Sequence, residues 1–255
     1  MKHTLGMATA ILALAVTQSA YATPTNISDN YIGSDNNGWG DVIGSTANFD
    51  VLSMDVELIG NMLSVSVNTN FAGKGDQKLF SSLTNNDLSN GNGIGYGDLF
   101  LATEWNPYGD APYIGDNASN GTQWDLAFSL DDRWTDGGTG NLYSLDGSEN
   151  ELLLSENFLS GGTFRNGQEM AVNRDGKRAL SSDIEWDITS GSINFLIDLT
   201  GTALEDSNTI ALRWGMTCGN DTIEGEYTVP EPAMLGLLAL GLIGIGFSQR
   251  RKTKA

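Results

Sequence analysis

Histidine and cysteine are almost absent from this 255-residue sequence, which contains one of each. Cys218 has no second cysteine with which to bond, so a disulfide within the chain is excluded. The single histidine, His3, lies at the start of the chain. Catalysis by Ser-His-Asp or Cys-His sets is therefore excluded for the rest of the chain, as are zinc and copper sites that depend on histidine.

Basic residues are also scarce, because 13 Lys and Arg stand against 32 Asp and Glu, which gives a formal net charge of −19. A protein this acidic repels nucleic acid and anionic membranes, so we expect no nucleic-acid partner. Its carboxylates suit divalent cations, which prefer oxygen ligands, although most surface carboxylates interact only with water.

Long apolar runs occur only at the two ends of the sequence. At the N-terminus, Lys2 precedes an uncharged stretch over residues 5–16, and Ala20-Tyr21-Ala22 follows. A positive start, an apolar segment too short to span a bilayer and a small-x-small site are typical of a secretory signal peptide. We therefore predict a signal peptide over residues 1–22, which signal peptidase removes after Ala22.

At the C-terminus, residues 233–247 form a second apolar stretch, of fifteen residues without a charge. A helix of this length is about 22 Å long, which would make it a short transmembrane helix. Four cations follow it, namely Arg250, Arg251, Lys252 and Lys254. Because positive charges that flank a span stay in the cytoplasm, the preceding domain is expected to face outward.

Val229-Pro230-Glu231-Pro232 stands directly before this stretch. Two prolines so close together favour an extended, exposed backbone that a processing enzyme can grip. The order of this motif, the apolar span, the basic cluster and the chain end resembles the PEP-CTERM sorting tail, which here would occupy residues 230–255 after Val229. A plain membrane anchor is the alternative.

The resemblance to PEP-CTERM proteins implies a partner and a location. It implies export through the inner membrane, transient anchoring there, processing by an exosortase and delivery to the cell surface or extracellular matrix. It also implies a Gram-negative bacterium that makes exopolysaccharide. It says nothing about the fold of the preceding domain, because many unrelated domains carry this tail.

Between the two ends, residues 23–229 form an ectodomain for which short alternating runs predict an all-β fold. Removing Lys2, the four tail cations and Glu231 leaves 8 Lys and Arg and 31 Asp and Glu, a net charge of −23. About ten segments alternate apolar with polar residues, and Gly60-Asn61, Asn166-Gly167 and Ser190-Gly191 predict hairpin turns. We expect one two-sheet β-sandwich or jelly roll, with polar loops at 73–95, 106–121 and 131–140.

The segment 35–41 is a tight, glycine-containing loop with several oxygen-bearing side chains. Asp35, Asn37 and Asp41 offer ligands of the kind that Ca²⁺ prefers, so they are candidate metal ligands. The loop is not an EF-hand, because Trp39 and Thr46 occupy ligand positions of that motif. The alternative is a turn in which these side chains bond only to nearby backbone.

Aromatic residues beside polar loops are the candidate sugar-binding groups. Trp105 ends a predicted strand, and Tyr108 and Tyr113 lie in the following loop with Asp110. Aromatic rings stack on the C–H faces of sugars, while Asp and Asn bond to the hydroxyl groups. The alternative is that these rings close the end of the sandwich as packing residues.

Carboxylates at alternate positions suggest a weaker, enzymatic interpretation. Asp183, Glu185 and Asp187 share one face of a predicted strand, about 7 Å apart, which is a spacing used in glycoside hydrolysis. A solvated strand face above a core of Ile and Trp is the alternative. We therefore predict a non-enzymatic surface protein associated with exopolysaccharide, with a polysaccharide hydrolase or lyase and a purely structural or adhesive coat protein as alternatives.

Overall fold

The computed structural model describes residues 24–230, which belong to one compact unit. The predicted signal peptide with Ala20 and Ala22, the tail residues Glu231 and Pro232, the apolar stretch 233–247 and the basic cluster lie outside the described residues. Among the residues described, no helix is long and apolar enough to cross a membrane.

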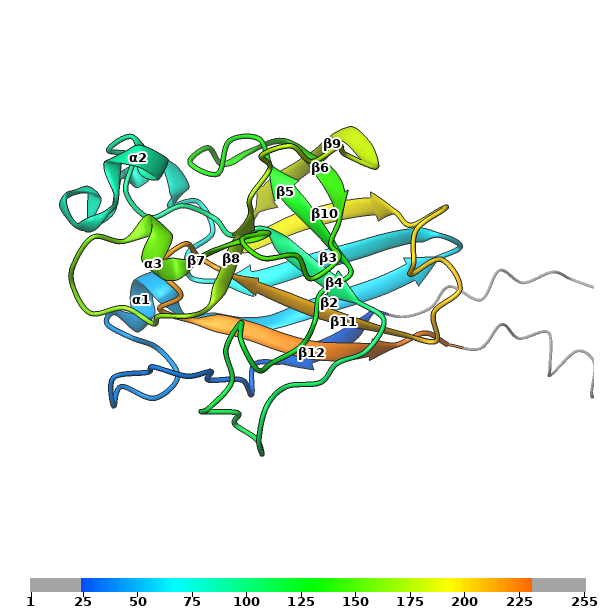
Figure 1. The fold of residues 1–255 in the computed structure, drawn as a ribbon, viewed down its shortest axis with the longest axis horizontal. Coiled ribbons are helices and arrows are strands. Elements are labelled where there is room, and N and C mark those ends of the chain that lie inside the picture. The colour runs from blue at the N-terminus through cyan, green and yellow to red at the C-terminus, as the bar shows by residue number, and fades with distance from the viewer. Residues whose placement is uncertain (1–23, 231–255) are drawn as a thin grey trace, which may run out of the picture. The chain divides into compact units, whose positions relative to one another are not determined.

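Within residues 24–230 the chain forms twelve strands and a few very short helices. The strands are β1 (Thr25–Ser28), β2 (Val51–Ile59), β3 (Met62–Thr69), β4 (Leu99–Ala102), β5 (Leu126–Leu130), β6 (Gly137–Ser144), β7 (Leu152–Leu154), β8 (Glu169–Val172), β9 (Ser181–Thr189), β10 (Ser192–Asp198), β11 (Thr209–Gly215) and β12 (Thr222–Thr228). The α-helices are α1 (Thr46–Phe49), α2 (Asn86–Ser89) and α3 (Ser155–Phe158), and they gather at one end of the molecule (Figure 1).

Ten of these strands form one continuous antiparallel sheet in the order β1-β2-β3-β10-β9-β6-β5-β4-β11-β12. The sheet curls until its two edges meet, because β12 contacts both β1 and β2. Gly225 in β12 leaves no room for a side chain, since a Cβ there would lie 2.4 Å from Ile27 in β1. The all-β prediction is confirmed, but the strands form one nearly closed, barrel-like sheet instead of two separate sheets.

Local alternation explains why two hairpins form as predicted. In β2 and β3, Met54, Val56 and Val65 point inward and are fully buried, while the intervening polar residues face outward. The turn at Gly60-Asn61 brings Ile59 opposite Met62. The β9–β10 hairpin turns at Ser190-Gly191 in the same way. The side chains from all parts of the curled sheet meet in one apolar core.

Strand β6 occupies part of the segment that was expected to be a polar loop at 131–140. Its first residues are Gly137 and Gly138, which obscure the alternating pattern in the sequence. Gly140 is required by packing, because a Cβ there would lie 2.6 Å from the ring of Phe128 and 2.7 Å from the carbonyl oxygen of Ser129 in β5. Gly140 therefore allows close approach inside the sheet instead of marking a loop.

The hairpin expected across Asn166-Gly167 does not form, and β8 pairs with β7 instead. This small second sheet packs on the main sheet through Val172 and Leu152, which lie in one apolar cluster with Phe100 and Ala211, and Asp98 bonds to it. The Asp98 backbone N–H donates to Met170 at 2.8 Å, and its carboxylate accepts the N–H of Val172 at 2.8 Å. The outer face of β11 is therefore covered, which buries a charged side chain there.

Candidate functional site

A buried arginine organises the outer face of the last two strands. Arg213 in β11 pairs directly with Glu224 in β12, and both are almost fully buried. The guanidinium donates to Glu224 Oε1, donates to Gln168 Oε1 at 2.6 Å and lies 3.4 Å from Glu169 Oε2. One guanidinium thus stands between two carboxylates, so this group keeps a net negative charge when both are ionised.

Burial changes the proton affinity of these carboxylates. Desolvation raises the pKa of Glu224 to about 7, although the positive charge of Arg213 partly opposes the rise. Burial raises the pKa of Glu169 as well, again against the influence of Arg213. The site therefore contains carboxyl groups whose charge changes closer to neutrality than usual, which is common at functional sites.

Glu224 also fixes an aromatic side chain. Its Oε2 accepts the indole N–H of Trp105 at 3.2 Å, and the Trp105 ring meets Tyr113 edge to face with ring centres 5.3 Å apart. Tyr113 in turn stacks on Tyr31 at 6.1 Å. Two of the three rings predicted to bind sugar therefore lie together, on a base of buried charged groups.

The loop that carries Tyr113 is held in a strained conformation. The backbone of Tyr113 has φ +58°, a left-handed conformation that a bulky residue adopts only when its surroundings impose it. Buried Asp116 supplies the constraint, because its carboxylate accepts the N–H of Tyr108 at 2.7 Å and the hydroxyl of Tyr31 at 2.7 Å. A Cβ at Gly121 would lie 2.5 Å from that carboxylate, so glycine makes room for it.

These groups border a pocket of about 370 Å³ on the outer face of β12, which we call the Trp105 pocket. It is lined by Thr25, Asn26, Ile27, Ser28, Asn30, Trp105, Tyr113, Glu224, Gly225 and Glu226. Glu224 and Glu226 are two positions apart on one strand face, which places them about 7 Å from each other. No lysine or arginine of residues 24–230 lines the pocket.

The structure separates the third sugar-binding candidate from the other two. Tyr108 is 56% exposed, does not line the Trp105 pocket and lies over Gly115. Glu224, Glu226 and Asn30 line the pocket, but the sequence reasoning did not select them. The alternation of Glu224 and Glu226 in the last strand was a visible signal, whereas nothing in the sequence joins that strand to Trp105.

Asp41, a predicted Ca²⁺ ligand, lies with two carboxylates from other parts of the chain. One carboxylate oxygen from each of Asp29, Asp41 and Asp221 lies within 4.8 Å of the others, and we call this group the Asp29 cluster. Two oxygens that each lie about 2.4 Å from the same Ca²⁺ are at most about 4.8 Å apart. These three residues could therefore hold one divalent cation.

The Asp29 cluster is partly enclosed and electrostatically strained. Burial, with help from the neighbouring carboxylates, raises the pKa of Asp29 to about 8 and that of Asp221 to about 9. Oδ2 of Asp29 is buried and has no hydrogen-bond partner among the described residues. Arg165 donates to the carbonyl oxygens of Gly40 at 3.0 Å and Asp41 at 2.6 Å, which fixes the loop.

The other two predicted metal ligands have protein partners. A carboxylate oxygen of Asp35 accepts the amide of Asn166 at 2.5 Å. The amide of Asn37 donates to the carbonyl oxygen of Asp35 at 2.9 Å and to that of Phe164 at 3.0 Å. The structure thus places these two side chains in a hydrogen-bonded loop and groups Asp41 with Asp29 and Asp221.

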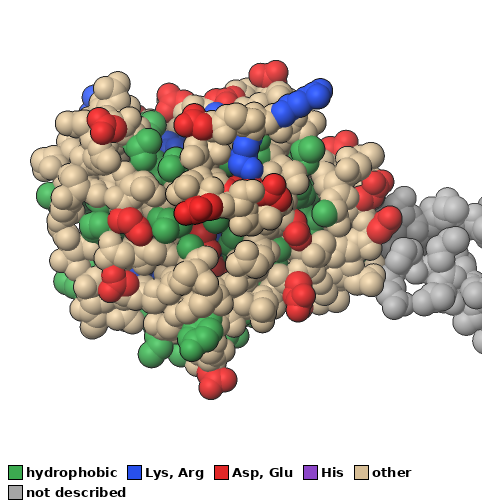
Figure 2. All heavy atoms as spheres, viewed as in Figure 1, with side chains coloured by type: hydrophobic (Ala, Val, Ile, Leu, Met, Phe, Trp, Pro, Cys, Tyr) green, Lys and Arg blue, Asp and Glu red, His purple; other side chains and the backbone are tan. Residues whose placement is uncertain are grey.

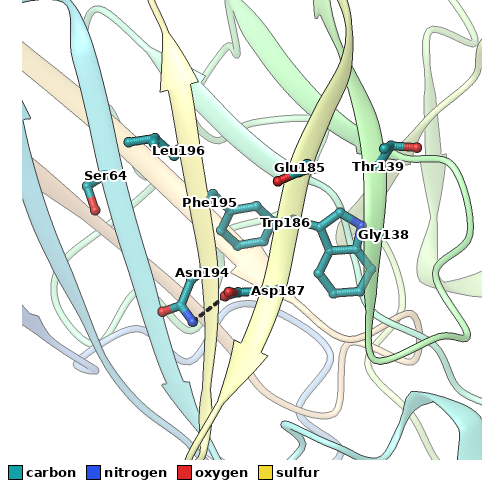
Figure 3. A pocket seen from close by; sticks show the side chains of 9 residues that line it. All are labelled: Ser64, Gly138, Thr139, Glu185, Trp186, Asp187, Asn194, Phe195 and Leu196. Carbon is teal, nitrogen blue, oxygen red and sulfur yellow. Dashed lines mark hydrogen bonds between the residues drawn. The ribbon is translucent and has the colours of Figure 1, made fainter.

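A larger hollow of about 740 Å³ lies over β9 and β10 (Figure 3). Here Glu185 and Asp187 lie on the outer face of β9, and Asn194 donates to Asp187 at 2.7 Å. Trp186 and Phe195 are at most 3% exposed, so their rings offer no free face for stacking. Asp183, the third carboxylate of the predicted acidic row, does not line this hollow and has φ +57° near the start of the strand.

Negative charge dominates the visible surface. Figure 2 shows Asp and Glu side chains scattered over this face of the ectodomain, with few Lys or Arg among them. The Trp105 pocket places two partly exposed rings beside Glu224 and Glu226, whereas the rings that line the hollow over β9 are buried.

Residues 228–252 match the family model of the PEP-CTERM protein-sorting motif. The chain carries a PEP-CTERM sorting tail. The tail marks the protein for export across the membrane to the cell surface, with an exosortase as its processing partner. No curated protein and no solved structure matches the chain, and the family of the ectodomain is not identified. Of the PEP-CTERM motif, the structure describes Val229, whose N–H donates to Asn208 at 2.9 Å, and the exposed Pro230.

Proposed function

We propose that this PEP-CTERM protein is a non-enzymatic component of the cell surface or extracellular matrix that binds polysaccharide in the Trp105 pocket. The observation that carries the proposal is the pairing of Trp105 and Tyr113 beside Glu226 and Asn30 in one pocket. Rings pack on the C–H faces of a sugar, and polar groups at the edge bond to its hydroxyls. The exopolysaccharide association of PEP-CTERM proteins supports the same conclusion.

Hydrolysis of the polysaccharide is the second candidate function, because Glu224 and Glu226 have the spacing of an acid and base pair. Both oxygens of Glu224 are engaged, one by Arg213 and the other by Trp105. A general acid must instead direct a proton toward the glycosidic oxygen. The arrangement favours binding, and we expect no release of reducing ends from any polysaccharide that the ectodomain binds.

A glycan array with residues 23–229 tests the binding function. We expect wild-type ectodomain to bind a polysaccharide class, and Tyr113→Ala to weaken that binding about fivefold, since an aromatic contact contributes about 1 kcal/mol. Tyr108→Ala is the matched control, because Tyr108 is exposed and lies outside the pocket. Absence of glycan binding by the folded wild type would instead favour a structural or adhesive coat protein.

We propose the remaining steps of export from the two ends of the sequence. Signal peptidase cleaves after Ala22, residues 233–247 anchor the protein transiently, and the exosortase acts at Val229-Pro230-Glu231-Pro232. The sequence supports this order by its apolar runs and by the terminal cations. Identification of Thr23 as the mature N-terminus by mass spectrometry tests the first step.

We also propose that Ca²⁺ binds at Asp41. The Asp29 cluster supports this through three carboxylates near one point, one of them with a buried and unpartnered oxygen. The loop ligands Asp35 and Asn37 remain the alternative set. The rise in melting temperature with Ca²⁺, compared between variants of Asp29 and Asp35, distinguishes the two ligand sets.

A further inference from the structure

We propose that the Trp105 pocket selects a cationic amino sugar, that is, a hexosamine unit whose amine is free and protonated; this inference rests on the proposed polysaccharide-binding function. The observation that carries it is the chemistry of the pocket wall, which presents hydrogen-bond acceptors and negative charge next to two aromatic rings. An ammonium group has three donors, no acceptor and a positive charge, so it complements all of these features.

Each side-chain amide of the pocket wall already donates one hydrogen bond inside the protein. The amide of Asn26 donates to Asp55 Oδ1 at 2.8 Å, and the amide of Asn30 donates to the carbonyl oxygen of Ser28 at 3.3 Å. The hydroxyl of Ser28 donates to the side-chain oxygen of Asn26 at 3.4 Å. The side-chain oxygen of Asn30 accepts no hydrogen bond from a described residue, so this pocket-lining amide keeps a free acceptor.

Glu226 supplies the free charge. Its side chain is exposed at the pocket and forms no hydrogen bond or ion pair with any described residue. Behind it, the guanidinium of Arg213 is fully buried between Glu224 and Glu169 and does not line the pocket, so no cation offsets the charge of Glu226 there. The field at the pocket is therefore negative, so a uronic acid or a sulfated sugar would be repelled.

The aromatic rings add a second attraction for the same group. An ammonium within about 6 Å of the centre of an indole or phenol ring is stabilised by the negative face of the ring. Trp105 is only partly buried, and Glu224 holds its indole in place. At about 370 Å³ the pocket is near the lower limit for small-ligand sites, so it suits one or two sugar units of a longer chain.

Calorimetric titration of the ectodomain at pH 6 tests this selection with three tetrasaccharides of equal length. These are a glucosamine tetramer with free amines, an N-acetylglucosamine tetramer and a galacturonate tetramer. We expect the glucosamine tetramer to bind about tenfold more tightly than its acetylated counterpart, because a hydrogen bond to a charged group typically contributes that much. The galacturonate tetramer should show no binding.

Three variants test whether the preference for the free amine arises in the Trp105 pocket. Glu226→Gln keeps the shape of the side chain and should remove the tenfold preference while leaving the affinity for the acetylated tetramer unchanged. Glu185→Gln removes an equal charge from the outer face of β9, away from the pocket, and should leave the preference intact. Tyr113→Ala should weaken the binding of both glucosamine-based tetramers.

The outcomes separate this inference from the proposed function. Equal affinity for the free and acetylated tetramers, with both lost in Tyr113→Ala, would overturn amino-sugar selection but leave polysaccharide binding in place. An equal loss in Glu185→Gln and Glu226→Gln would show attraction to the overall acidic surface only, which also overturns it. If neither these tetramers nor any glycan of the array binds, the proposed function itself fails.

Discussion

The indole N–H of Trp105 donates to Oε2 of Glu224 at 3.2 Å, although 119 positions separate these residues in the chain. Through this bond the loop after β4 is joined to the last strand of the sheet. Because the other oxygen of Glu224 is held by Arg213, the carboxylate connects the aromatic wall of the pocket to the buried charge network.

Breaking this bond should destabilise the ectodomain. Trp105→Phe keeps an aromatic ring but leaves Glu224 Oε2 without its donor, which we expect to lower the free energy of unfolding by about 1–3 kcal/mol. Urea denaturation measures the change. In a double-mutant cycle with Glu224→Gln, the combined loss should be smaller than the sum of the two single losses, and additive losses would show that the contact contributes nothing.

The Asp29 cluster should make the metal-free protein less stable as pH rises. The folded pKa values of Asp29 and Asp221, about 8 and about 9, lie above those of free Asp, so the folded state binds more protons than the unfolded state. The free energy of unfolding should therefore fall from about pH 4 through pH 9, by up to about 1.4 kcal/mol per pH unit for each proton involved. Denaturation in EDTA across this range measures the slope.

Asp29→Asn is the control for that slope, because an amide can still accept the N–H of Tyr31 through its oxygen. The variant should show a shallower pH dependence and should be more stable than wild type at pH 8 in EDTA. An unchanged slope would mean that Asp29 does not hold a proton in the folded state.

Ca²⁺ should reverse this instability. Protein stripped with EDTA and returned to Ca²⁺ at a hundred times its dissociation constant gains about 2.7 kcal/mol, which is about 5–11 °C in melting temperature for a domain of this size. Asp29→Asn and Asp41→Asn should each abolish the rise if the Asp29 cluster binds the ion. Asp35→Asn should keep the rise, whereas its loss in Asp35→Asn and Asp41→Asn but not in Asp29→Asn would assign the ion to the 35–41 loop.

Gly140 should be intolerant of any side chain. A Cβ at this position would meet the Phe128 ring and the Ser129 backbone at less than 3 Å, and backbone cannot move aside easily. We expect Gly140→Ala to cost about 1–3 kcal/mol or more of stability, measured by thermal unfolding. Gly161→Ala is the matched control, since the nearest atom to its Cβ is 4.0 Å away, and it should melt within a degree or two of wild type.

The tail should control sorting without affecting the fold. Replacing Pro230-Glu231-Pro232 with three alanines should leave uncut protein in the inner membrane, because the exosortase no longer finds its extended recognition segment. Fractionation and immunoblotting of cells measure this. Normal arrival of the variant at the surface would reduce the segment to a simple anchor.

The sequence predicted those parts of the fold that depend on residues close together in the chain. The hairpins at Gly60-Asn61 and Ser190-Gly191 could be predicted because turn and alternation lie within about twenty residues. Strand β6 could not be predicted, because its Gly140 is required by contact with Phe128 and not by local propensity. The pattern also predicted two separate sheets where one curled sheet forms. The two arrangements differ in how far the sheet curls, and no local sequence signal determines that.

The same distinction applies to the sites. Trp105 and Tyr113 could be selected together because one loop carries both. Their partner Glu224 comes from the far end of the chain, so only the pairing of β11 with β12 reveals it. Asp41 could likewise be recognised as an oxygen ligand, whereas Asp29 and Asp221 join it only because β1 and β12 meet.

Strand β12 leads directly into the sorting tail, and this continuity has a mechanical consequence. Glu226 of the Trp105 pocket precedes Pro230 by four residues, at most about 14 Å of extended chain. A pull between a polymer bound at Glu226 and an anchored tail would act along the end of β12 and load its pairs with β11 from Glu226 to Thr228 in shear, so that their hydrogen bonds resist together. The rest of the barrel would lie outside this line of force, and the protein could act as a short, stiff link between matrix and envelope.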